Sequence, residues 1–285
     1  TWDSIKEGFG KLFNWVVDIK DKLYDKLVSP FVEFLKFAGG DLKNKVVKTS
    51  KGNFKYDYLV IALGSKTNLN VPGLKEYCFE LKTIKHAQEI RKAVFDEFKK
   101  GNKKISIAVI GAGPAGLAAA GELAMMGHQP VIFEATDRLG GMTSFGIPRY
   151  RLPLSVIEEN GRFILDNSNI ELRTNVVVGR DVLVADLLHS GGFSAVIAAV
   201  GAHLPRKMPL EGRDLKGVFE GVDFLREVAC EKPTNHGKRV AVIGGGNVAM
   251  DAARTSLRLG ANHVLLVYRR GLAEMPASAE EIQHA

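Results

Sequence analysis

The chain has 285 residues, of which 46% are hydrophobic, so it is long enough to bury the cores of about two domains. The sequence predicts no signal peptide, and it has no apolar run near the roughly 18 residues of a membrane-spanning helix. Its two distant cysteines, Cys78 and Cys230, exclude a disulfide framework and a cysteine-ligated cluster.

The net charge of +7 does not indicate nucleic-acid binding, because it lies entirely in the first third of the chain. Residues 1–104 hold 21 Lys+Arg against 13 Asp+Glu, whereas residues 105–285 hold 18 against 19. The kind of basic residue also changes, since residues 1–104 contain 20 Lys and one Arg, whereas residues 105–285 contain 4 Lys and 14 Arg. We interpret the change as a junction near residue 104 between stretches of different history, through natural fusion, engineering or an error in the gene model.

Apolar residues recur at helical spacing from Trp2 to Leu35, and Pro30 interrupts the stripe. The pattern predicts an amphipathic helical segment over residues 1–37. Such a segment packs on a partner or on its own domain, or makes peripheral contact with a membrane surface.

The sequence pattern of residues 38–104 predicts part of a flavoprotein-like domain. Residues 45–64 have the pattern of a β-hairpin that turns at SKGN and leads into a buried strand. A Pro-Gly turn at Pro72 and a helix over residues 85–100 follow. The stretch YDYLVIALGS, residues 56–65, looks like the close of a nucleotide-binding domain, yet no glycine-rich opening precedes it.

A strand, a glycine turn, a helix and a second strand follow from Ile105. Gly111, Gly113 and Gly116 form G-x-G-x-x-G, in which the missing Cβ atoms let the backbone turn tightly and approach a pyrophosphate. Glu134 ends the second strand 18 residues after Gly116, where a carboxylate can accept hydrogen bonds from a ribose. The sequence therefore predicts a dinucleotide site.

A second unit of the same kind has G-x-G-x-x-A at Gly244, Gly246 and Ala249. Its second strand ends in Arg269 and Arg270 instead of an acid. Arginines there favour a ribose 2′-phosphate, so we expect NADP(H) in preference to NAD(H). The alternative is that the arginines are a solvated strand end.

The predicted fold is therefore α/β, with two Rossmann-like dinucleotide-binding domains over residues 105–225 and 226–285 and an N-terminal amphipathic helical segment. A flavin and a nicotinamide nucleotide on adjacent domains would pass hydride directly, so we expect no catalytic side chain and no metal site. His128, His203 and His263 are interpreted as surface or turn residues.

Residues 105–285 resemble the flavoprotein family of the glutamate synthase small subunit, which includes the NADPH-handling subunit of ferredoxin:NADP oxidoreductases and the flavin half of dihydropyrimidine dehydrogenase. The matching stretches include VIGAGPAGLAAAGELA, DRLGGMTSFGIPRYRLP and GKRVAVIGGGNVAMDAARTSLRLGA. By that resemblance the residues that hold FAD are Gly111, Gly113, Pro114, Ala115, Gly116, Glu134, Arg138, Gly140, Gly141, Val177, Ala199 and Gly201. Those that hold NADPH are Gly244, Gly246, Asn247, Val248, Arg269 and Arg270.

The same resemblance assigns roles within the FAD group. Arg138, Gly140 and Gly141 flank the pyrophosphate and the flavin, Val177 lies near the adenine, and Ala199 to Gly201 close the domain. The relatives usually carry a cysteine-rich cluster domain upstream, whereas residues 1–104 contain only Cys78, so we do not expect electron exit through built-in clusters. The chain also stops before the remaining strands of the second domain and a Gly-Asp contact to FAD, so both sites are expected to be incomplete.

Residues 41–100 instead resemble part of a type II NADH dehydrogenase, so YDYLVIALGS would be a tail whose own head is absent. For residues 1–37 no resemblance to a family is identified from the sequence.

The expected function is FAD-dependent electron transfer from NADPH to an acceptor, with an electron-accepting protein or partner subunit, in the cytoplasm. One alternative is a type II NADH:quinone dehydrogenase at a membrane surface, and another is a truncated or fused fragment that binds nucleotide without catalysis.

Overall fold

A computed structural model gives the fold of this chain, and it groups the residues differently from the ranges expected above. One compact unit combines Thr1–Gly64 with Pro205–Ala285, and the other is Ser65–Leu204. The described residues are 32–66, 71–74, 79–80, 92, 104–166, 169–232 and 237–284. The expected boundaries at residues 104 and 225 thus do not separate the units, because the elements near them pair with distant segments.

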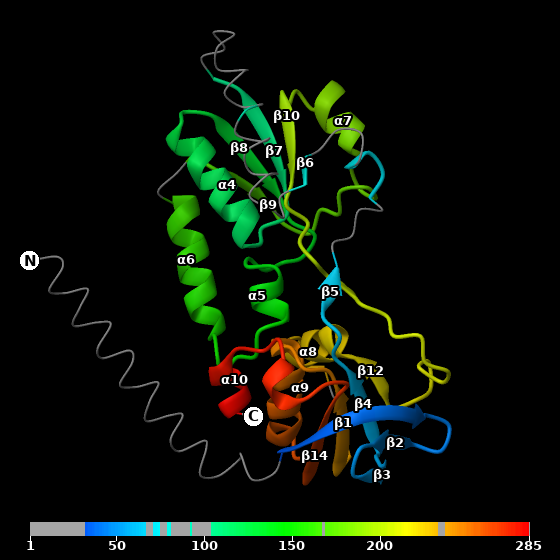
Figure 1. The fold of residues 1–285 in the computed structure, drawn as a ribbon. Coiled ribbons are helices and arrows are strands. Elements are labelled where there is room, and N and C mark those ends of the chain that lie inside the picture. Colours follow the sequence, from blue (N-terminus) through cyan, green and yellow to red (C-terminus); the bar gives the residue numbers. More distant parts are fainter. Residues whose placement is uncertain are drawn as a thin grey trace, which may run out of the picture. The chain divides into compact units, whose positions relative to one another are not determined.

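The unit Ser65–Leu204 is built on a five-stranded sheet in the order β6-β10-β7-β8-β9, in which every pair is parallel (Figure 1). The strands are β6 (Phe79–Glu80), β7 (Ser106–Ile110), β8 (Gln129–Phe133), β9 (Glu171–Arg173) and β10 (Ala195–Ala198). The helices are α4 (Pro114–Met125), α5 (Met142–Phe145), α6 (Leu154–Asp166) and α7 (Val184–His189).

Helices cover both faces of this sheet. Helix α4 packs on one face beside α6, and α7 lies on the other face. The strand β7 alternates accordingly, since Ile107 and Val109 face α4 while Ala108 and Ile110 face α7. A strand that is buried on both faces reads as a continuous apolar run, as ISIAVI does.

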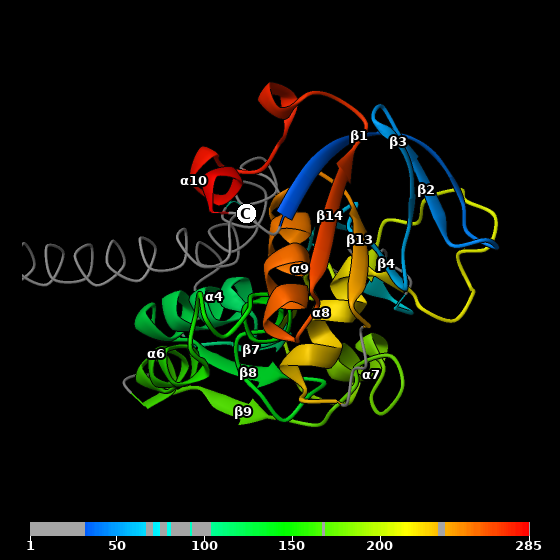
Figure 2. The ribbon, with the colours of Figure 1, turned by 90° about the horizontal axis from the view of Figure 1, so that it is seen from below.

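The other unit is built on a seven-stranded sheet in the order β12-β4-β13-β14-β1-β2-β3 (Figure 2). The strands are β1 (Val32–Asp41), β2 (Val46–Thr49), β3 (Gly52–Lys55), β4 (Tyr58–Ile61), β12 (Val218–Glu220), β13 (Arg239–Ile243) and β14 (His263–Tyr268). The helices are α8 (Gly221–Ala229), α9 (Asn247–Arg258), the 3-10 turn η2 (Leu272–Glu274) and α10 (Ala279–Gln283). Two short strands, β5 (Ser65–Lys66) and β11 (Leu204–Pro205), pair with each other.

Helices α8 and α9 pack on one face of the seven-stranded sheet (Figure 2), where Phe224 and Met250 are fully buried. The opposite face carries a second apolar cluster that includes Leu42 and Val47. Residues that precede β4 in the sequence are therefore part of the core of this unit.

The strand β1 corrects the expectation of a helix up to residue 37. Its backbone pairs in parallel with β14, from Val32 opposite Val264 to Lys36 opposite Tyr268, and in antiparallel with β2. The first half of β1 pairs with β14 and the second half with β2, and these ladders satisfy backbone groups that a helix would satisfy internally, so tertiary pairing overrides the helical periodicity. Residues 1–31 of the expected helix lie outside the described residues.

The stretch YDYLVIALGS also corrects an expectation, because its strand β4 has a glycine-rich neighbour. It pairs in parallel with β13, and Asp57 just before it bonds Arg239, 182 positions later in the chain. The strands that we expected the second domain to lack are supplied by β1 and β4. The stretch YDYLVIALGS therefore belongs to the sheet of the second glycine unit, although it precedes that unit in the sequence.

Several local expectations are confirmed. Strands β2 and β3 form the predicted hairpin, and Gly73 turns with φ +86°. The helix expected over residues 85–100 falls almost wholly outside the described residues. Within the described part of the chain, no helix has both the length and the hydropathy for crossing a membrane.

Candidate nucleotide-binding sites

The first glycine turn joins β7 to α4. Gly111 follows the strand with φ +105°, and its N–H donates to the carbonyl of Phe133 at 2.8 Å. A Cβ on Gly111 would lie 2.5 Å from the carbonyl oxygen of Ala199, and a Cβ on Gly116 would overlap the carbonyl of Gly111. Both positions therefore require glycine, because backbone segments approach too closely for a side chain.

Helix α4 begins without a side-chain cap. Gly113 is the N-cap, Pro114 occupies the first turn, and the N–H of Leu117 donates to the carbonyl of Gly113 at 2.9 Å. The N–H groups of Ala115 and Gly116 precede the first helical bond, so they point out of the helix end. A Cβ on Gly113 would meet nothing closer than 3.9 Å. The turn therefore offers N–H donors and open space, as a diphosphate requires.

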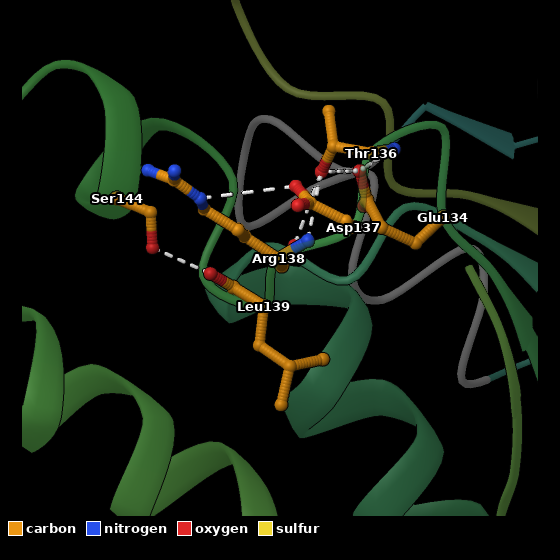
Figure 3. A network of polar contacts seen from close by, with 6 residues as sticks. All are labelled: Glu134, Thr136, Asp137, Arg138, Leu139 and Ser144. Carbon is orange, nitrogen blue, oxygen red and sulfur yellow. Dashed lines mark hydrogen bonds and ion pairs between the residues drawn. The ribbon is translucent and has the colours of Figure 1, made fainter. Parts of the chain in front are cut away.

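Glu134 lies directly after β8 and binds the glycine turn itself. Its Oε2 accepts a hydrogen bond from the N–H of Ala112 at 2.7 Å. Its Oε1 accepts from the N–H and the hydroxyl of Thr136, at 2.9 and 2.8 Å. Figure 3 shows the hydroxyl of Thr136 directed at this carboxylate. The sequence did not single out Thr136 or Ala112, although a Glu-x-Thr stretch at a strand end is a signal for such a local bond.

The carboxylate of Glu134 keeps some acceptor capacity despite these bonds. A carboxylate has about four lone-pair sites, and the three donors from Ala112 and Thr136 leave one of them for a further donor. Glu134 is only 7% exposed, so little of its carboxylate is open to solvent. The geometry suits one ribose hydroxyl.

The loop that carries Arg138, Gly140 and Gly141 packs against the first glycine turn. The N–H of Gly140 donates to the carbonyl of Ala112 at 2.8 Å, and a Cβ on Gly141 would lie 3.0 Å from the Cα of Gly113. Both glycines of this loop have positive φ, +96° and +52°. The structure thus brings these predicted residues beside the turn.

Side chains hold that loop in place. The hydroxyl of Ser144 donates to the carbonyl of Leu139, as Figure 3 shows, and that of Thr143 donates to the carbonyl of Gly140 at 2.7 Å. The ε-nitrogen of Arg138 lies 3.8 Å from Asp137. These contacts fix the backbone that approaches the turn.

Val177 lies next in space to the end of β8, since the N–H of Val176 donates to the carbonyl of Glu134 at 2.9 Å. Its own backbone is already bonded. Its N–H donates to Asp181 Oδ2 at 2.8 Å, and its carbonyl accepts from the N–H of Asp181, also at 2.8 Å. The side chain of Arg180 and this N–H lower the pKa of Asp181 to about 2. Because its backbone groups are both bonded to Asp181, Val177 has only its side chain available for contact with the adenine of a nucleotide.

Ala199 and Gly201 lie beside the first glycine turn. The N–H of Ala199 donates to the carbonyl of Ile110 at 2.8 Å, and Gly201 turns the chain with φ +65°. Both residues thus lie where the sequence placed them, at the carboxyl end of β10 beside Gly111.

The second glycine turn joins β13 to α9 in the same manner. Gly244 has φ +154°, and its N–H donates to the carbonyl of Val267 at 2.9 Å. A Cβ there would overlap the carbonyl of Ala62 and lie 3.0 Å from the Cβ of Ala249. Gly246 is the N-cap of α9 and, like Gly113, has no side chain to cap the helix.

A segment after β14 folds onto this turn. The carbonyl of Gly245 accepts from the N–H of Ala277 at 3.1 Å, and the Oδ1 of Asn247 accepts from the N–H of Ser278 at 3.1 Å. Asn247 therefore shapes the turn with its side-chain oxygen, whereas Val248 beside it is half-buried. No local sequence pattern predicts this contact.

A buried ion pair holds the same segment to α9. The Nη1 of Arg254 lies 2.9 Å from Glu281 Oε2 in α10, and the two side chains are 5% and 10% exposed. The pair links the two helices at a point that no local sequence pattern reveals.

Arg269 and Arg270 lie at the carboxyl end of β14, where the sequence predicted them. Both are exposed, and neither forms an ion pair with another residue in the described ranges. Their guanidinium groups are available to a phosphate.

The expectation that the histidines are surface or turn residues needs one correction, at His128. Among the described residues no group of three His, Cys, Asp or Glu side chains could hold a metal ion. His263 is exposed, as expected. His128 does lie in the turn after α4, where its N–H donates to the carbonyl of Leu123, but it is only 3% exposed and is therefore not a surface residue.

Comparison with protein families gives a match over most of the chain. Residues 31–178 and 105–285 each match the family described as "Pyridine nucleotide-disulphide oxidoreductase". Both matched ranges contain the first glycine turn.

Individual relatives agree with this match. The chain is 45% identical over 182 residues to "NADP(+)-dependent formate dehydrogenase subunit beta" of Moorella thermoacetica, covering 63% of this chain and 25% of the relative. It is 40% identical over 200 residues to "Glutamate synthase [NADPH] small chain" of Escherichia coli strain K12, covering 66% and 41%. The chain thus spans less than half the length of these relatives.

Among solved structures, FprA of Mycobacterium tuberculosis in complex with NADPH is similar. It matches with a TM-score of 0.56 and 28% sequence identity, over 62% of this chain and 46% of FprA.

Proposed function

Because this chain belongs to the pyridine nucleotide-disulphide oxidoreductase family, we propose that it transfers electrons from NADPH to FAD and on to a protein acceptor. One observation carries the proposal. A strand, a glycine turn and a helix occur twice in the chain, with a carboxylate after the second strand in one unit and arginines in the other. Since charge at this position selects the ribose, the two turns suit different dinucleotides.

The FAD site of the proposal is the turn Gly111–Gly116. Its fit rests on the open space at Gly113, the uncapped start of α4 and the remaining acceptor site on Glu134. Arg138 and Gly141 would flank the diphosphate. A positive guanidinium and outward N–H groups both favour an anion at this place.

The NADPH site of the proposal is the turn Gly244–Gly246 with Arg269 and Arg270. Two exposed guanidiniums attract a 2′-phosphate, which carries more negative charge than a ribose hydroxyl. A carboxylate there would repel the same group. This argument favours NADPH over NADH.

The chemistry in this proposal belongs to the cofactors. When bound, FAD accepts a hydride equivalent from the nicotinamide, while the protein binds and orients the two nucleotides. No side chain is required as an acid or a base. The protein contributes by positioning three kinds of group around the nucleotides: the backbone N–H donors of the glycine turns, the carboxylate of Glu134 and the guanidinium of Arg269.

The acceptor is proposed to be a protein, either a partner subunit or a soluble electron carrier in the cytoplasm. Relatives are named as a "subunit beta" and a "small chain", names that describe components of larger assemblies. Membrane contact through residues 1–37 stays a prediction, because residues 1–31 lie outside the described part of the chain.

The proposal is tested by the absorption spectrum of the purified chain reconstituted with FAD, recorded before and after anaerobic NADPH. We expect a bound flavin that bleaches on addition of NADPH and responds far less to NADH. Gly111→Ala should lose FAD, whereas Gly127→Ala should keep it. Both glycines have positive φ, but a Cβ at Gly127 meets nothing within 4 Å.

The rival functions give different results in the same experiment. A preference for NADH together with quinone reduction would favour a type II NADH dehydrogenase. Protein that takes up no FAD would favour a non-catalytic fragment. Either result contradicts the proposal.

A further inference from the structure

Both sheets place a strand that ends in Ala-x-Gly beside the strand that leads into a glycine turn. In the five-stranded sheet this neighbour is β10, followed by Ala199 and Gly201. In the seven-stranded sheet it is β4, followed by Ala62 and Gly64. The strand β4, which precedes its glycine turn in the sequence, thus occupies the position that β10, which follows its glycine turn, occupies in the other sheet.

The hydrogen bonds repeat as well. The N–H of Ala199 donates to the carbonyl of Ile110 at 2.8 Å, and the N–H of Ala62 donates to the carbonyl of Ile243 at 2.7 Å. In each case the bond joins the first residue after the flanking strand to the last residue before the glycine. The two strand ends are therefore held in the same register.

Close packing fixes the end of β4 against the second glycine turn. The carbonyl of Ala62 occupies the space where a Cβ on Gly244 would lie. A Cβ on Gly221, at the start of α8, would be 2.9 Å from the Cβ of Ala62 and 3.2 Å from Val248. Ala62 is 3% exposed, so it acts as a spacer between the turn and α8.

The strand order makes this edge of the sheet a candidate ligand site. On one side of β13 lie β14 and β1, and on the other lie β4 and β12. The order reverses between β13 and β4, and ligands of open parallel sheets bind outside the carboxyl ends of strands at such a switch point. In the proposed NADPH site Arg269 at the end of β14 contacts the adenosine half of the dinucleotide, so the other half would extend over the end of β4.

The backbone after β4 suits this role. The N–H groups of Leu63 and Gly64 have no acceptor within the described ranges. Gly64 has φ +83°, and a Cβ there would meet nothing within 4 Å. The turn therefore presents donors beside open space.

We propose that Ala62, Leu63 and Gly64 form the wall of the second site that contacts the nicotinamide mononucleotide half of the cofactor. This inference rests on the proposed NADPH site and adds residues from the opposite end of the chain to it. Under this proposal Ala62, Leu63 and Gly64 affect only the binding of ligands that contain the nicotinamide half, because ligands that consist of adenosine alone do not reach them.

The test compares two ligands in the variant Gly64→Phe by equilibrium titration. NADP+ should bind more weakly than to the original chain by about tenfold or more, which corresponds to about 1.4 kcal/mol. Adenosine 2′,5′-bisphosphate, which lacks the nicotinamide half, should keep its affinity within about twofold, because single measured contributions vary by that much. Gly64→Ala serves the same comparison if the larger side chain prevents folding.

The matched control is Gly52→Phe in the hairpin of the same segment. Gly52 also has positive φ, +125°, and also has nothing within 4 Å of a Cβ, so its backbone strain is similar. It should leave both affinities unchanged. Unchanged NADP+ affinity in Gly64→Phe, or an equal loss for both ligands, would overturn the inference. Failure of the original chain to bind either ligand would instead remove the NADPH site on which the inference depends.

Discussion

Glu134 and Arg269 follow the second strand of their respective glycine units, but the protein holds them differently. Glu134 is 7% exposed and accepts three hydrogen bonds from Ala112 and Thr136. Arg269 is exposed and has no ion pair with the described residues. Replacing Glu134 would disturb the turn itself, whereas replacing Arg269 should cost little folding free energy. Arg269 is therefore the cleaner position for testing cofactor choice.

The variant Arg269→Glu should lower the affinity for NADPH by at least about tenfold, since a hydrogen bond to a charged group is worth about 1.5–3 kcal/mol. The affinity for NADH should change much less, because its ribose carries a hydroxyl in place of the phosphate. Titration of the flavin-loaded protein with each nucleotide measures the ratio.

Arg162→Glu on α6 is the control for net charge. Arg162 is also exposed and makes the same change of two charges, but in the other unit. It should leave the preference for NADPH intact. Equal losses of NADPH and NADH affinity in Arg269→Glu would contradict the assigned role.

At the scale of elements, the sequence predicts what is encoded locally. Glycines with positive φ, such as Gly111, and apolar runs, such as the one at Ile107, indicate the two strand-turn-helix units and their cofactor edges. The hairpin of β2 and β3 is encoded in the same way by its turn residues.

The partners of these strands could not be predicted in this way. A buried strand such as β4 carries no mark of its neighbour, because any parallel strand satisfies its backbone groups. Its pairing with β13 depends on contacts 182 positions apart, such as Asp57 with Arg239. For the same reason Val32–Phe37 read as a helix, although β14 and β2 pair with them as a strand.

The contact between Asp57 and Arg239 can be tested by pH. The guanidinium and the N–H of Arg239 donate to the carboxylate at 2.8 and 3.0 Å and lower the pKa of Asp57. A lowered pKa stabilises the fold above the unfolded value and loses that effect as pH falls through the folded value. Asp57→Asn should therefore be less stable than the original chain at neutral pH, by at most about 1 kcal/mol for a solvent-exposed pair.

The difference between Asp57→Asn and the original chain should begin to shrink as pH falls below about 3.8, the unfolded pKa, and should disappear below the lowered folded pKa, since a protonated carboxyl resembles the amide. Urea unfolding at a series of pH values measures it. A difference that does not change with pH would mean that the pair adds no electrostatic stability to the β4–β13 contact.

At the scale of the whole molecule, the chain enters one unit, crosses to the other and returns. Ligand binding should therefore protect segments by unit and not by position in the sequence. FAD should slow hydrogen exchange in β7 and β8. NADP+ should slow it in β13 and also in β4, although β4 precedes the whole FAD unit in the sequence.

The size of this protection follows from linkage. A ligand at about 100 times its dissociation constant stabilises the unit that binds it by about 2.7 kcal/mol, which slows exchange through unfolding of that unit by about 100-fold. The stabilisation reaches β4 only if β4 and β13 unfold together, as their shared ladder and the burial of Leu59 and Val60 require. Protection of β4 by FAD with no response to NADP+ would mean that YDYLVIALGS belongs to the first glycine unit after all.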